Sequence, residues 1–170
     1  MSSGTGQRTR RASRETGRVA VFGALALLVA GCAAGAEPLP AQDAVAHYDA
    51  AADALTAELP AQEWTLNAVQ RTVQEEDGTC RYSPGVWEAG ETLDGVSGDQ
   101  GWEEVTDRLD PVLAEHGFED LGAPTRSGAL YSVSTHDGHG AELVLDEQGR
   151  LSLRGALIDT TTCTKSALGL

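Results

Sequence analysis

Apolar residues recur at steps of three and four between residues 43 and 59, and this spacing predicts an amphipathic helix. The apolar positions fall on one helical face and are Val45, Tyr48, Ala52, Leu55 and Leu59. Pro60 follows directly, and it is expected to end the helix because proline lacks the amide hydrogen that a helix interior needs.

A second helix is predicted to begin at Asp99 or Gly101, either of which can cap it. Its buried stripe is formed by Trp102, Val105, Leu109 and Val112. Pro111 falls inside this stretch, so we expect a kink or a division into two segments. Gly117 is expected to end the helix in the left-handed conformation, followed by Phe118 folding back onto the helix.

Alternating apolar and polar residues predict strands before and after the second helix. The expected strands are 63–73 with a bulge, a short one at 86–89, a short one at 118–123, and then 130–135, 141–146 and 150–158, with Leu143, Leu145, Leu151, Leu153 and Leu157 facing inward. The dipeptides Asp137-Gly138 and Gln148-Gly149 supply hairpin turns. The predicted fold class is therefore α+β: one domain in which an antiparallel β-meander sheet packs against two helices.

The chain begins with a positively charged segment followed by the uncharged apolar run 19–30. This layout is typical of a signal peptide, here residues 1–31. The run is shorter than the roughly 20 residues that span a bilayer, so a permanent transmembrane helix is disfavoured.

The stretch Leu28-Val29-Ala30-Gly31-Cys32 resembles the lipobox of bacterial lipoprotein precursors. The resemblance implies that the Cys32 thiol receives a diacylglyceryl group and becomes the first residue of the mature chain. Residues 32–42 would then be the lipidated cysteine and a short tether, and residues 43–170 a single domain on the extracytoplasmic side of the cell membrane. The alternative is an ordinary secretory leader with an incidental cysteine.

Charge narrows the possible partners. The whole chain has a net charge of −14, and without residues 1–31 it has seven basic and 25 acidic residues. So acidic a domain offers no basic patch to phosphates, which argues against nucleic acid as a partner. Anionic headgroups would repel it, so the predicted membrane attachment depends on the acyl chains at Cys32.

Two cysteines remain after the lipidated one, Cys80 and Cys163. An even pair in an oxidising compartment predicts a disulfide between them. Two free thiols or a metal site are the alternatives, although no CxxC motif or matching histidine spacing supports a metal.

The helix at Trp102, its Gly117-Phe118 end, the strands that follow and the late Cys163 resemble small LppA-like lipoproteins of actinobacteria. The resemblance covers about residues 64–163. It implies a fold and an envelope location but no activity, because the group has none assigned.

Two short segments could hold a metal. The cluster His136-Asp137-Gly138-His139, with His116 or Glu142 as a further ligand, could bind zinc or copper, but its spacing also fits a plain hairpin turn. The acidic loop between Asp94 and Asp99 could hold calcium, but Val96 and Val105 stand where the calcium loop of EF-hands needs oxygen ligands.

Catalytic motifs are absent: the sequence has no GxSxG, SxxK or HExxH. Trp64, Trp87 and Trp102 could stack on wall sugars, but two of them lie on apolar stripes and are expected in the core. We therefore expect no cofactor and a non-enzymatic envelope module that binds a protein or cell-wall partner. The alternatives are an envelope hydrolase whose site the sequence does not reveal, and a metal- or calcium-binding lipoprotein.

Overall fold

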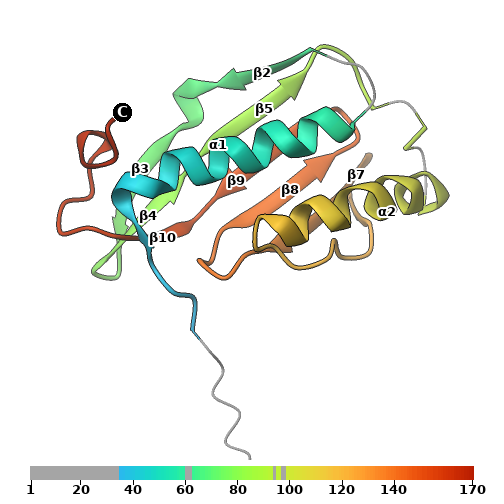
Figure 1. The fold of residues 1–170 in the computed structure, drawn as a ribbon. Helices are drawn as coiled ribbons and strands as arrows, with labels where there is room; N and C mark the ends of the chain where they lie inside the picture. The colour runs from blue at the N-terminus through green and yellow to red at the C-terminus, as the bar shows by residue number, and fades with distance from the viewer. Residues whose placement is uncertain (1–34, 60–62, 94, 97–98) are drawn as a thin grey trace, which may run out of the picture. The chain divides into compact units, whose positions relative to one another are not determined.

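Two helices lie on one side of the β-strands in the computed structural model, which describes residues 35–59, 63–93, 95–96 and 99–170, the side chains of 99 and 100 excepted (Figure 1). The predicted signal peptide, Cys32 and Asp94 lie outside the described residues. Along the chain the elements are β1 (Leu39–Pro40), α1 (Ala41–Glu58), β2 (Trp64–Asn67), the 3-10 turn η1 (Ala68–Gln70), β3 (Thr72–Glu76), β4 (Thr79–Ser83), β5 (Gly85–Ala89), α2 (Asp99–Glu115), β6 (Thr125–Ser127), β7 (Leu130–His136), β8 (Glu142–Asp146), β9 (Arg150–Arg154), β10 (Ala156–Asp159) and the 3-10 turn η2 (Lys165–Leu168).

The strands form two sheets, in the orders β1-β10-β4-β3 and β2-β5-β9-β8-β7-β6. All pairings are antiparallel except that of β1 with β10. The predicted fold class, α+β with an antiparallel-rich sheet against two helices, is confirmed.

One core joins the helices to both sheets. Its largest fully buried side chains are Tyr48 and Leu55 of α1, Trp102, Leu109 and Leu113 of α2, Tyr82, Val133, Leu143, Leu145, Leu151 and Leu153 of the strands, and Val96 of the segment before α2. The helical positions lie four or seven residues apart, and the leucines of β8 and of β9 lie two apart, so each of these elements buries one face.

Three chain segments that lie side by side are each interrupted where they pass from one sheet to the other, and we call these positions the line of breaks. The chain passes from β2 to β3 through η1, from β4 to β5 through Pro84, and from β9 to β10 through Gly155. The pairs Asn67↔Val86 and Thr72↔Ser83 stand on either side of the line, as do Gly85↔Leu153 and Tyr82↔Ala156. The strand predicted over 63–73 is therefore divided between the two sheets rather than bulged within one.

The break at Gly155 also changes which side chains face the core. The strand predicted over 150–158 is two strands, because Gly155 takes a φ of 82° that favours glycine. Leu151 and Leu153 are buried before it, whereas Ala156 and Ile158 are buried after it. The expected inward position of Leu157 is therefore wrong, since the extra residue shifts the alternation by one.

Three further local predictions concern the strand at 118–123, the effect of Pro111 and the end of the second helix at Gly117. Residues 118–123 form no strand beyond a bridge from Phe118 to Asp137, and β4 and β6 were not expected. Helix α2 runs through Pro111 without dividing, since Leu113 in its last turn is still fully buried and this packing offsets the lost hydrogen bond. The predicted end is confirmed: Gly117 has a φ of 80°, and the Phe118 amide donates to the Leu113 carbonyl at 3.0 Å.

Candidate functional site

The turn between β7 and β8 carries the histidine cluster singled out by the sequence, and its aspartate organises it. Asp137 is only 9% exposed. Its Oδ1 accepts hydrogen bonds from the backbone amides of His139 (2.9 Å) and Ala141 (2.7 Å), and its Oδ2 accepts one from the Tyr48 hydroxyl at 2.8 Å. The carboxylate therefore closes the turn and fastens it to α1.

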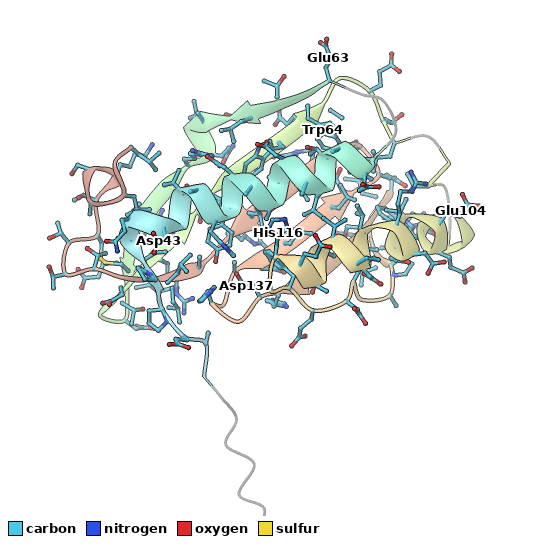
Figure 2. The ribbon with its side chains drawn as sticks, viewed as in Figure 1. Asp43, Glu63, Trp64, Glu104, His116 and Asp137 are labelled. Carbon is cyan, nitrogen blue, oxygen red and sulfur yellow. A yellow bond between two sulfur atoms is a disulfide. The ribbon has the colours of Figure 1, made fainter. Side chains whose placement is uncertain are left out.

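Three histidines lie around this aspartate, and they come from separate elements. The His47 ring on α1 stands edge-on to the His139 ring, with centroids 5.8 Å apart. Burial lowers the pKa of His47, and His139 and His116 lower it further, while Asp137 opposes them. Figure 2 shows His116 and Asp137 on the helix side of the protein. The sequence did not single out His47, since nothing in its own surroundings indicates this contact.

The predicted metal ligands do not converge. His136 is exposed, and the Nδ1 of His139 is engaged with the Glu37 carbonyl at 2.7 Å. No group of three or more histidine, cysteine, aspartate or glutamate side chains suited to a metal occurs in the described part of the chain. Of the expected calcium ligands, Asp94 lies outside the described residues and Asp99 begins α2. The metal hypotheses gain no support.

Burial raises the pKa of the Tyr48 hydroxyl well above its usual range, and the neighbouring Asp137 raises it further. Tyr48 therefore stays protonated and donates its hydrogen bond at any ordinary pH. A group held in this way serves to position α1 and is not available as a base.

Two arginines satisfy carbonyl groups at the line of breaks. The buried Arg71 donates to the Pro84 carbonyl at 2.8 Å and forms an ion pair with Asp49 of α1. Arg81 donates to the Gly155 carbonyl at 3.0 Å. Because a break removes ladder partners from the backbone, these side chains take over hydrogen bonds that a neighbouring strand would otherwise make.

The other side of the sheet carries a polar groove over the same line of breaks. In β4 the core side chains Cys80 and Tyr82 alternate with Arg81 and Ser83, so the latter two face away from the helices. One hollow of about 530 Å³ is lined by Gln74, Glu75, Glu76, Arg81, Ser83, His136, Gly140, Glu142, Arg154 and Gly155. A second of about 340 Å³ shares Gln74, Ser83 and Arg154 with it. We call the two hollows together the outer groove.

Opposite charges are paired within the outer groove, each pair between two neighbouring strands. Arg154 contacts Glu142 at 2.7 Å, and Arg81 contacts Glu76 at 2.5 Å. The carboxylates are partly exposed, and so are both guanidinium groups. Such a surface can bind a molecule that carries both charges, exchanging these exposed ion pairs for contacts to the ligand, because exposed pairs contribute little to stability.

The outer groove also contains a serine and a histidine, the residue types of a nucleophile and a base. Ser83 and His136 both line the outer groove, but no hydrogen bond joins them among the described residues. Trp87 and Trp102 are in the core, as expected, and Trp64 is half-buried.

Cys80 and Cys163 form a disulfide, the pairing expected from the sequence, with their Cα atoms 5.2 Å apart. The bridge joins the buried side of β4 to the segment between β10 and η2. It thereby closes the C-terminal segment over one end of α1, against which η2 packs.

Comparison with known proteins shows a shared fold. No protein-family model matches the chain, and no curated protein sequence does. Among solved structures, the chain is similar to LppA of Mycobacterium tuberculosis, described as a candidate lipoprotein, with a TM-score of 0.50 and 16% identity over 78% of this chain and 83% of that one. In the described part of the chain no helix is long and apolar enough to cross a membrane.

Proposed function

We propose that the protein is a lipid-anchored module of the bacterial cell envelope that binds a partner in its outer groove. The anchor is the diacylglyceryl group on Cys32, and the module stands on the extracytoplasmic side of the membrane. The lipobox-like stretch before Cys32 supports the anchor, and so does the shared fold with a candidate lipoprotein.

The observation that carries the binding role is the outer groove itself. It is lined by partly or fully exposed arginine, glutamate, amide and hydroxyl groups on the face that the helices leave free. Polar groups held in a concave surface without a hydrogen-bonded nucleophile and base fit recognition better than catalysis. The ligand class that matches the paired charges is a zwitterionic molecule, for instance an envelope peptide bearing amines and carboxylates.

Site-specific photo-crosslinking in intact cells tests this function. A photoreactive residue at Gln74, inside the outer groove, should yield a discrete crosslinked species, and the same residue at Glu104 on α2 should not. The additional substitution Arg154→Glu should abolish the Gln74 product, because it leaves Glu142 facing another acid. Arg108→Glu makes the same charge change on α2 and should leave the product unchanged.

The anchor is tested separately by fractionation of the same cells. The wild-type chain should sediment with membranes, and Cys32→Ala should release it from tight association. Equal yields at Gln74 and Glu104 would contradict binding in the groove. A Cys32→Ala protein that stays firmly in the membrane would contradict lipidation.

A further inference from the structure

The segment that precedes α1 is fastened to the body of the protein well before the helix begins. The Glu37 amide donates to the Gly138 carbonyl at 2.9 Å, and the Glu37 carbonyl lies 2.7 Å from the Nδ1 of His139. Two residues later, β1 pairs with β10, with Leu39 opposite Ile158. We call the Glu37 contacts with Gly138 and His139 the clamp. The body of the protein therefore holds the chain from Glu37 onward.

This clamp lies beside the outer groove. Gly140 takes a φ of 78°, and a Cβ atom there would come within 3.2 Å of the Ala36 side chain, so the tether passes close against the turn. Gly140 also lines the larger hollow of the outer groove. The tether thus leaves the body at the edge of the groove and at the end of α1 where Asp43 lies (Figure 2).

Chain length then limits how far this end can stand from an anchor at Cys32. Five Cα steps separate Cys32 from Glu37 and span at most about 18 Å when fully extended. Helix α1 has 18 residues and is about 27 Å long, so its far end at Glu58 can lie much farther from the anchor. If the chain were unattached as far as residue 42, both ends of α1 could lie at similar distances from the anchor.

We propose that the clamped end of the body faces the membrane and that the outer groove opens within reach of the lipid headgroups. This inference rests on the proposed anchor at Cys32. It narrows the ligand of the groove to the zwitterionic headgroup of a phospholipid, in place of a peptide of the cell wall. Arg81 and Arg154 would face the phosphate, and Glu76 and Glu142 the cationic group.

Energy transfer from single positions on the full-length lipidated protein to the membrane tests this orientation. The protein is placed in phosphatidylcholine vesicles that carry an acceptor dye on some headgroups. A fluorescent residue is introduced at one of three exposed positions: Gln42 at the clamped end, Gln74 in the outer groove, or Glu58 at the far end of α1. Transfer should be strong from Gln42 and Gln74 and weak from Glu58.

A lengthened tether provides the matched control. Thirty Gly and Ser residues inserted between Ala34 and Gly35 leave the clamp intact and add about 30 Å of average reach. Transfer from Gln42 and Gln74 should then fall, and the difference from Glu58 should be lost. Transfer from Gln74 that is no greater than from Glu58 with the native tether would overturn the proposed orientation. Failure of the protein to float with the vesicles would instead overturn the lipid anchor.

Discussion

The two helices are held to the same sheets by different kinds of contact. The buried face of α2 is apolar, with Trp102, Val105, Leu109 and Leu113. The buried face of α1 is mostly alanine with Tyr48 and Leu55, and it is also fixed by the Tyr48–Asp137 hydrogen bond and the Asp49–Arg71 ion pair. Apolar packing is largely non-directional, whereas hydrogen bonds fix distance and angle.

The features with a candidate function lie on the α1 side of the protein. The clamp, the disulfide and the turn at Asp137 all adjoin α1, and all are linked by bonds of fixed geometry. The α2 side adds buried area and stability. We infer that the α1 side defines where the tether and groove stand, and that α2 mainly stabilises the core.

Loss of the disulfide should have the largest effect on stability. The bridge closes a loop with a sequence separation of 83. Replacing both cysteines by serine, Cys80→Ser with Cys163→Ser, should therefore lower the free energy of unfolding by about 4–5 kcal/mol on the chain-entropy model. Urea unfolding measures this loss.

Hydrogen exchange on the same double variant sharpens the comparison between the helices. Amide protection should fall first in α1, β4 and η2, and later in α2. An unchanged urea midpoint would contradict a stabilising bridge, and equal loss of protection in both helices would contradict the separation of the two sides.

The second largest effect on stability should come from removing apolar area under α2. Leu109 is 1% exposed, and Leu109→Ala should cost about 2–5 kcal/mol through lost burial and the cavity left behind. The cost should be measured by urea unfolding, with Leu109→Met as a volume-conserving control that loses less than about 1.5 kcal/mol. Because α1 has its own bonds, transfer from Gln42 to labelled vesicles should be unchanged. Altered transfer in a folded Leu109→Ala protein would show that α2 also sets the orientation.

The smallest predicted effect is a pH dependence of stability that arises from His47 on α1. Burial and His139 hold the pKa of His47 below 6.5 in the folded protein, so the unfolded chain binds the proton more readily. Stability should be fully present above pH 6.5 and fall as the pH drops below it, by at most about 1.4 kcal/mol per pH unit for one proton.

His47→Gln should flatten this dependence in unfolding curves measured between pH 5 and 8. His136→Gln, which replaces an exposed imidazole at the end of β7, serves as the control for the loss of one histidine. A slope of the opposite sign would contradict the lowered pKa of His47.

The spacing of apolar residues predicted most elements, because a helix or strand that buries one face needs apolar residues at the period of that element. The stripes through Tyr48 and Leu109 predicted both helices, and the alternation around Leu143 and Leu145 predicted β8. The line of breaks was missed, because a shift of one residue at Gly155 looks like continued alternation until the burial of Ile158 is known.

The site was less predictable, since its contacts join residues far apart in the sequence. Tyr48 and Asp137 are 89 positions apart, and Glu37 reaches His139 across 102. The histidines around the turn were visible as a cluster, but their partners were not. A local motif shows which groups are present, whereas the choice between a metal site and a buried aspartate depends on the fold.

Gly155 determines which side chains of β10 face the core. Its left-handed backbone advances the alternation by one position, so that Ile158 points to the core and Leu157 away from it. A deletion of this single residue would restore the uninterrupted alternation and exchange inside for outside along all of β10. Gly155 itself lines the outer groove, and β10 pairs with β1, so this one glycine bears on both the groove and the attachment of the tether.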